Sequence, residues 1–383
     1  MTSRSVAVVG AAECDLGVTN ASVLELQTQA VTRALADAGL SLRDVDGFAT
    51  NNVSRFSTTT MSDYFGIRPT WVDSSFVGGS AFESYVARGV QAIEAGQANV
   101  VVVSYASNQR SARSRSLGGV HEDHLPEAQF ETPYGPLFPL SYYAMAAQAY
   151  LDRFGVTRAQ LAEIAVSARE WALLNPKAFR YGSGPLTVDD VLGSTMISTP
   201  LTAGDCCLVT DGGGAVVLTS AARARELAQK PVVVLGYGES TGHSAMASCD
   251  DILDTGAARA ANKAYATSGL TPGDIDVVEV YDSFTITAAL SLEALGLCGP
   301  GEAVVMAADG LLRPGGSLPV NTSGGGLSYC HPGQFGILLL VEAVRQLRGE
   351  CGPRQVPDAE IAVAHGTGGI LSHHSTVLLG VDR

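Results

Sequence analysis

Three short polar segments contain the residue types that acid–base chemistry on a carbonyl compound needs. In the first, Tyr281, Asp282 and Ser283 follow the apolar run VVEV. The second reads Tyr329-Cys330-His331-Pro332, and the third places His365 in AHGTGG. A free phenol has a pKa of ~10 and is a weak base, but neighbouring groups that stabilise phenolate or relay its proton make it useful. An imidazole and the backbone N–H groups of a helix start can together hold an oxyanion.

The elements that position these segments are repeated along the chain. An apolar strand over 5–13 resembles 232–240, and the segment 36–48 resembles 266–278. Two further strands agree in the same order, with 98–105 matching 359–366 and 213–220 matching 374–381. Four pairs in one order indicate an internal duplication.

Each half is therefore predicted to alternate strands and helices, with helices at about 22–38, 80–95 and 334–348. Continuous apolar strands such as NVVVV predict sheets that are buried on both faces. We divide the chain into 1–228 and 229–383, and the first half carries an insertion at about 106–202 that we expect to form a helical cap over the active site.

Composition excludes several classes of function. The formal charge of −14 argues against a nucleic-acid surface. None of the seven cysteines forms the CxxC spacing of a zinc ribbon, and we predict no metal site. The N-terminus is predicted to be a strand rather than a signal peptide, and no apolar run is long enough to span a membrane. The expected location is the cytoplasm, with reduced thiols.

The duplicated pattern resembles the thiolase superfamily over nearly the whole chain. Tyr281-Asp282-Ser283-Phe284 stands where thiolases carry Asn-Glu-Ala-Phe or His-Asp-Cys-Phe, and Cys330-His331-Pro332 stands where they carry Gly-His-Pro. The resemblance implies a five-layered α-β-α-β-α fold built from duplicated βαβαβαββ halves. The position of the thiolase nucleophile reads Gly78 in VGGSAFESY, so the attacking cysteine is missing.

In lacking this cysteine, the chain resembles the steroid side-chain aldolases, which also lack the nucleophile. The resemblance implies retro-aldol cleavage of a β-hydroxyacyl-CoA in steroid degradation, and hence a carbon–carbon lyase. Tyr281, Tyr329 and His331 are then the predicted catalytic residues. Their predicted neighbours are Asp282, His365 and Gly78, and Gly325 and Gly326 are predicted to approach the CoA thioester.

The resemblance also implies coenzyme A as part of the substrate, no other cofactor, a homodimer, and a small OB-fold and zinc-ribbon partner protein. Two alternatives stay open at this point. The chain is a thiolase or acyltransferase that uses another thiol, for which Cys330 is the best-placed candidate, or it is a non-catalytic carrier of acyl-CoA or sterol. Packing is the structural alternative for each predicted site residue.

Overall fold

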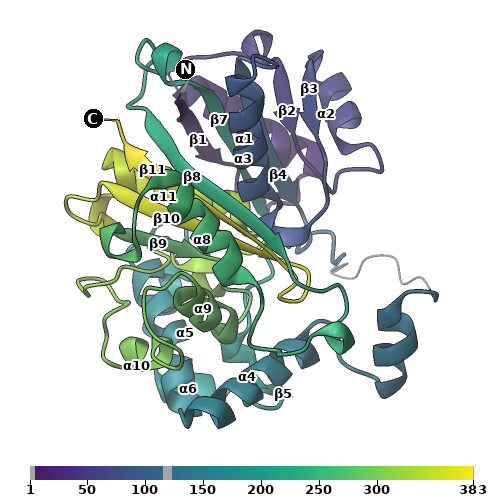
Figure 1. Ribbon diagram of the computed structural model, residues 1–383, viewed down its shortest axis with the longest axis vertical. Coiled ribbons are helices and arrows are strands. Elements are labelled where there is room, and N and C mark those ends of the chain that lie inside the picture. The colour runs from purple at the N-terminus through teal and green to yellow at the C-terminus, as the bar shows by residue number, and fades with distance from the viewer. Residues whose placement is uncertain (1–4, 115–122, 383) are drawn as a thin grey trace.

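A computed structural model describes residues 5–114 and 123–382 and contains one nine-stranded sheet. The strands lie in the order β3-β2-β4-β7-β1-β8-β11-β10-β9 (Figure 1). Their bounds are β1 (Val6–Glu13), β2 (Gly47–Ala49), β3 (Trp71–Asp73), β4 (Val100–Ser107), β7 (Gly212–Ser220), β8 (Val232–Thr241), β9 (Val277–Val280), β10 (Ile361–Gly368) and β11 (His373–Val381). A separate pair is formed by β5 (Met196–Ser198) and β6 (Leu201–Thr202).

The helices surround this sheet on both faces. They are α1 (Val23–Asp37), α2 (Ser57–Phe65), α3 (Ala81–Glu94), α4 (Leu140–Phe154), α5 (Arg158–Ala172), α6 (Val188–Leu192), α7 (Ala221–Ala224), α8 (Ala257–Ser268), α9 (Thr285–Ala294), α10 (Ala303–Ala308) and α11 (Gly336–Arg348). No helix in these two described stretches has the length and apolar character to cross a bilayer.

The sheet consists of two halves with the same topology. In the first half β2 is parallel to β3 and β4, and β7 is antiparallel to β4 and β1. In the second half β9 is parallel to β10 and bridges Val320 in parallel, and β11 is antiparallel to β10 and β8. The four repeated sequence segments thus occupy equivalent places. The halves join edge to edge where β1 and β8 pair at only two positions, so the two predicted sheets are one continuous sheet.

The layers follow from the burial of each face. The central helices α3 and α11 contact each other and strands of both halves, and their residues share one hydrophobic core with both parts of the sheet. Two further cores lie outside, one beneath α1 and the other beneath α8 and α9. The result is the predicted α-β-α-β-α arrangement. Ser22 is the N-cap of α1, since its side chain accepts from the backbone N–H of Glu25.

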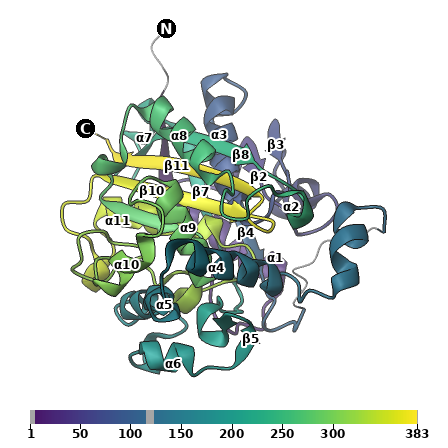
Figure 2. The same cartoon turned by 60° about the horizontal axis from the view of Figure 1, so that its bottom comes forward.

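The insertion supplies α4, α5 and α6, which lie below the second half of the molecule in Figure 2. Helix α5 packs on α9 and α10, and α4 packs on α9, where the rings of Tyr143 and Phe284 have centroids 4.4 Å apart. The insertion is therefore helical and covers mainly the second half.

A buried carboxyl group lies in the central layer. Glu83 of α3 is fully buried, and neither of its oxygens has a hydrogen-bond partner in another described residue. Glycines make room for it, because a Cβ on Gly336 or Gly366 would lie 2.6 or 2.3 Å from its Oε2. Burial raises the pKa of Glu83 from 4.5 to about 8. The folded protein therefore keeps this group protonated at neutral pH.

This raised pKa predicts that the stability of the wild-type protein falls as pH rises. The Glu83→Gln variant should lack this pH dependence, because its amide does not titrate. The folded state holds a proton that the unfolded state releases above pH 4.5, so the stabilising contribution is complete below that pH and is lost as pH rises toward about 8. At roughly 1.4 kcal/mol per pKa unit, the loss amounts to about 4–5 kcal/mol. In melting curves from pH 5 to 9, the Tm of Glu83→Gln should rise relative to the Tm of wild type as pH increases. A difference that stays constant over this range would contradict the prediction.

Candidate active site

A cavity of about 500 Å³ lies where the two halves and the insertion meet. The exit of β9, the loop before α11, the turn before α3, the β10–β11 turn and the start of α4 all contribute to its wall. The lining residues used below are Val77, Gly78, Gly79, Cys206, Cys207, Tyr281, His331, Gly333, Thr367, Gly368, Gly369 and His373.

Two of the predicted catalytic residues meet in this wall. The Tyr281 hydroxyl lies 3.0 Å from His331 Nε2 and donates to the Gly333 carbonyl at 3.3 Å. The tautomer of His331 decides whether the phenol or the imidazole is the donor in the 3.0 Å contact. Phe335 stacks on the imidazole with ring centroids 6.2 Å apart. Burial raises the pKa of Tyr281 well above its ordinary value, so the phenol stays protonated.

The turn before α3, residues Gly78–Ser80, is shaped by its two glycines. A Cβ on Gly79 would lie 2.1 Å from Cε2 of Tyr281, so the tyrosine ring occupies the space of a side chain. Gly78 has a φ of +72°, and a Cβ there would lie 2.7 Å from the backbone N of Gly369. The position at which thiolases carry their cysteine is thus closed to any side chain unless the backbone moves.

Asp282 supports the loop beneath the imidazole. Its carboxyl group is fully buried and accepts from the backbone N–H groups of Gly326 at 2.6 Å and Leu327 at 3.3 Å. Burial raises the pKa of Asp282 to about 7. A Cβ on Gly325 would lie 2.1 Å from Asp282 Oδ2, and a Cβ on Gly326 would lie 3.1 Å from Cδ2 of His331. These glycines wrap a carboxyl group and do not line the cavity, and their predicted contact with the thioester stays a prediction.

Tyr329 and His365 also lie outside the cavity wall. Tyr329 is buried, and its surroundings include Glu13 and Arg345, which form an ion pair. His365 Nδ1 lies 2.8 Å from Thr376 Oγ1, and its ring stacks on His374. Burial lowers the pKa of His365 to about 4. The structure brings Tyr281, His331 and Gly78 together and does not bring these two residues to them.

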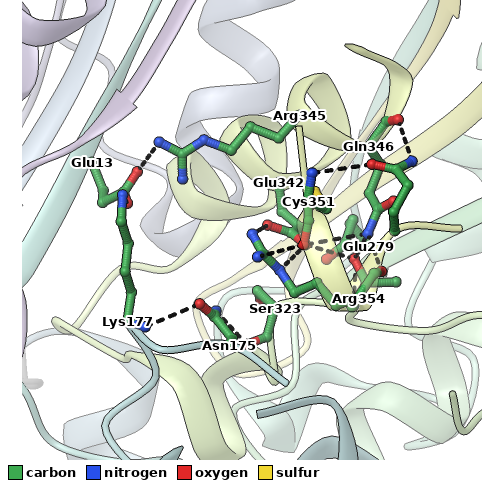
Figure 3. A network of polar contacts seen from close by, with 12 residues as sticks. Glu13, Asn175, Lys177, Glu279, Ser323, Glu342, Arg345, Gln346, Cys351 and Arg354 are labelled. Atoms are coloured by element: carbon green, nitrogen blue, oxygen red, sulfur yellow. Dashed lines mark hydrogen bonds and ion pairs between the residues drawn. The ribbon is translucent and has the colours of Figure 1, made fainter. Parts of the chain in front are cut away.

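A buried polar network holds strand β9 on α11 (Figure 3). Arg354 pairs with both carboxylate oxygens of Glu342 at 2.9 Å. The Thr322 hydroxyl lies 2.9 Å from Glu279 Oε1 and 2.7 Å from Glu342 Oε1. One hydroxyl hydrogen cannot serve both, so one carboxyl carries a proton. Burial, followed by the charge of Glu342, raises the pKa of Glu279, which is the protonated partner. Because Glu279 lies two residues before Tyr281, this network fixes the strand that presents the phenol.

The cysteines are placed differently from the sequence-based expectation. Cys330 is fully buried, its Sγ lies 3.2 Å from Thr210 Oγ1, and it is absent from the wall. Burial raises the pKa of the Cys330 thiol to about 12. Cys206 and Cys207 line the cavity instead. The sequence contained no signal for these two, because only folding brings the end of the insertion beside Tyr281. The described residues contain no group of three His, Cys, Asp or Glu arranged to hold a metal.

We predict that removal of the cavity thiols leaves turnover within about threefold of wild type. The retro-aldol reaction that the sequence resemblance implies needs no covalent step. Cys330, whose buried thiol has a raised pKa, is a poor nucleophile. The test is the activity of Cys206→Ala/Cys207→Ala, combined with mass spectrometry after iodoacetamide treatment of the native protein. Cys330 should remain unmodified. Stoichiometric loss of turnover with an acyl group trapped on any cysteine would contradict the prediction.

Comparisons with known proteins agree with this geometry. Residues 238–381 match the family model of the thiolase C-terminal domain-like proteins. The chain is 37% identical to the 17-hydroxy-3-oxo-4-pregnene-20-carboxyl-CoA lyase of Mycobacterium tuberculosis, over 96% of this chain and 98% of that protein. It is also 35% identical to an acetyl-CoA acetyltransferase of Methanothermobacter thermautotrophicus, over 97% and 99% of the two chains.

Among solved structures, the Ltp2-ChsH2(DUF35) aldolase superposes with a TM-score of 0.89 at 32% identity, covering 100% of this chain and 99% of that chain. Both the lyase and this aldolase match over their full length, and the position of the thiolase nucleophile is a glycine here. The chain belongs to the thiolase superfamily, in the branch of the steroid side-chain aldolases.

Proposed function

We propose that this protein cleaves the β-hydroxyacyl-CoA side chain of a steroid by a retro-aldol reaction. The observation that supports this most is the pairing of Tyr281 with His331 at 3.0 Å, in a cavity whose nucleophile position is closed at Gly78. A thiolase reaction needs an acyl-enzyme at that position, whereas retro-aldol cleavage needs only proton transfers. Coenzyme A enters as part of the substrate.

The reaction requires two proton transfers. The β-hydroxyl loses a proton as the Cα–Cβ bond breaks, and the resulting thioester enolate gains one at the α-carbon. A buried phenol that stays protonated suits the second step, in which Tyr281 gives its proton to the α-carbon and His331 returns one to the phenol oxygen. The helical turn Gly78–Ser80 precedes α3, and Gly78 and Gly79 line the cavity, so the first backbone N–H groups of this turn would hold the enolate oxygen.

The test substrate is the compound in the name of the mycobacterial relative, 17-hydroxy-3-oxo-4-pregnene-20-carboxyl-CoA. Its hydroxyl group is on the carbon β to the thioester, so retro-aldol cleavage gives a 17-keto steroid and propionyl-CoA. The assay follows both products by mass spectrometry, with the small OB-fold and zinc-ribbon partner protein present. Formation of an acyl-enzyme, or transfer of the acyl group to free CoA without the ketone, would favour an acyltransferase instead.

A small OB-fold and zinc-ribbon partner is part of the proposal. The superposed Ltp2-ChsH2(DUF35) aldolase has a DUF35 component in its name, and that chain matches this one over 99% of its length. We expect the chain to show little turnover alone and full turnover with such a partner. We also propose a cytoplasmic location, where thiols stay reduced.

We further propose a homodimer formed through β3, the edge strand of the first half. Val72 in this strand is 52% exposed, and the nearby chain segments expose Phe56 at 65% and Phe76 at 63%. Sedimentation at micromolar concentration should give twice the chain mass, and Val72→Lys should shift it toward the monomer. A wild-type protein that sediments as a monomer would contradict this proposal.

A further inference from the structure

A second histidine in the cavity wall has no role in the mechanism so far. His373 begins β11 and lines the same cavity as Tyr281. Its Nδ1 lies 2.8 Å from the Ser80 hydroxyl, in the turn that leads into α3. The tyrosine ring packs on Gly79, the residue before Ser80. The two side chains therefore flank the same turn from different strands.

The position of His373 follows from the register of β10 and β11. Gly368 pairs with His373 across this hairpin. A Cβ on Gly368 would lie 1.8 Å from the Val77 carbonyl and 2.7 Å from Ser80 Oγ. Only a residue without a side chain allows the turn to pack this closely on the sheet. The close packing is what brings the Ser80 hydroxyl to the imidazole.

The contacts of Ser80 accommodate the tautomer that a base at Nε2 requires. When the Ser80 hydroxyl donates to the Val77 carbonyl at 3.2 Å, the 2.8 Å contact is a donation from Nδ1–H of His373 to the Ser80 oxygen. In that tautomer of the neutral ring, Nε2 is unprotonated. Within residues 5–114 and 123–382 no hydrogen bond reaches Nε2, and it is not among the enclosed polar atoms without a partner, so it is open to the cavity.

The charges around His373 permit it to act as a base. Burial lowers the pKa of His373, the carboxylate of Glu239 on β8 raises it, and the guanidinium of Arg88 on α3 lowers it. The adjacent His374 is buried on its other side and stacks on His365. The ring is thus neutral at pH 7, and Glu239 favours the imidazolium that forms when Nε2 takes a proton.

We propose that His373 is a further catalytic residue, the base that takes the proton of the substrate β-hydroxyl on Nε2. This inference rests on the proposed retro-aldol function. The O–H electrons form the ketone, and the electron pair of the Cα–Cβ bond goes to the thioester enolate. Tyr281 protonates the α-carbon, and His331 returns a proton to the phenol oxygen. His373 then releases its proton to water, and His331 takes one up, which closes the cycle without another reactant.

Two reactions separate this base from the Tyr281–His331 pair. Cleavage of 17-hydroxy-3-oxo-4-pregnene-20-carboxyl-CoA needs both groups. Exchange of the α-hydrogens of propionyl-CoA in D₂O involves only proton transfer at the α-carbon. In His373→Asn the amide reaches the Ser80 hydroxyl but nothing replaces Nε2. We expect cleavage to fall at least 100-fold in this variant, while exchange stays within about threefold of wild type. Tyr281→Phe should lose both reactions.

Two further variants complete the experiment. Ser80→Ala removes the hydroxyl group that contacts Nδ1 of His373, and it should lower kcat/KM roughly tenfold and shift the acid limb of the pH profile. His374→Gln is the matched control, a buried histidine next in the strand, which should keep the wild-type profile. Three outcomes would each overturn the inference. They are cleavage by a folded His373→Asn variant within tenfold of wild type, an equal loss of cleavage and exchange in that variant, and an unchanged pH profile in Ser80→Ala. Absence of cleavage by wild type would overturn the proposed function, and the inference with it.

Discussion

Tyr281→Phe is expected to lower kcat for side-chain cleavage by roughly 10²–10⁴-fold, the usual contribution of a positioned acid or base. The variant keeps the aromatic ring that packs on Gly79 and loses only the hydroxyl group between His331 and Gly333. Loss of such a hydrogen bond should change stability by about 1 kcal/mol. Substrate binding should hold, because the ring and the rest of the wall are unchanged. Steady-state cleavage with the partner present, together with a melting curve, measures both effects.

The matched control is Tyr265→Phe on α8. Its phenol also donates to a backbone carbonyl, that of Leu295 at 3.0 Å, but it does not line the cavity. This variant should lose a similar amount of stability and keep its turnover. Tyr329→Phe tests the second predicted tyrosine, and its place outside the wall leads us to expect a loss below tenfold. A folded Tyr281→Phe enzyme with near-native kcat would contradict the proposed mechanism.

The fold was predictable from the sequence because it rests on repetition and apolar patterning. Strands such as 100–107 are buried along their whole length, and the duplicated segments occupy equivalent strands in the two halves. The central helices were predicted to within two residues, since the apolar face of α3 and the glycine after α11 define them. The edge-to-edge joining of the halves was not predicted, because only two residue pairs produce it.

The site was predictable only where a local motif carried it. Tyr281 and His331 follow strand and loop signals that a single segment displays. The role of His373 depends on hairpin register and on the absence of a side chain at Gly368, and a linear sequence displays neither. Cys330 looked well placed because it adjoins His331, yet alternation along the chain turns its thiol toward Thr210 and away from the cavity.

Gly79→Ala should be nearly as damaging as removal of the phenol, although it adds only a methyl group outside the reacting atoms. The new Cβ would lie 2.1 Å from Cε2 of Tyr281 and 2.7 Å from the Thr367 carbonyl. The carbonyl belongs to β10 and cannot move far, so the tyrosine ring must shift and the contact of 3.0 Å with His331 must break. We expect kcat/KM to fall at least 100-fold, with a stability loss of about 1–3 kcal/mol from overpacking.

Gly182→Ala is the matched control, since a Cβ there meets nothing within 4 Å. Gly79→Ala/Tyr281→Leu should recover the lost stability without recovering activity, because the smaller side chain frees the space but carries no hydroxyl group. Activity assays and melting curves of the four proteins, wild type included, decide the matter, and a Gly79→Ala enzyme with near-native kcat/KM would show that the ring does not depend on this glycine.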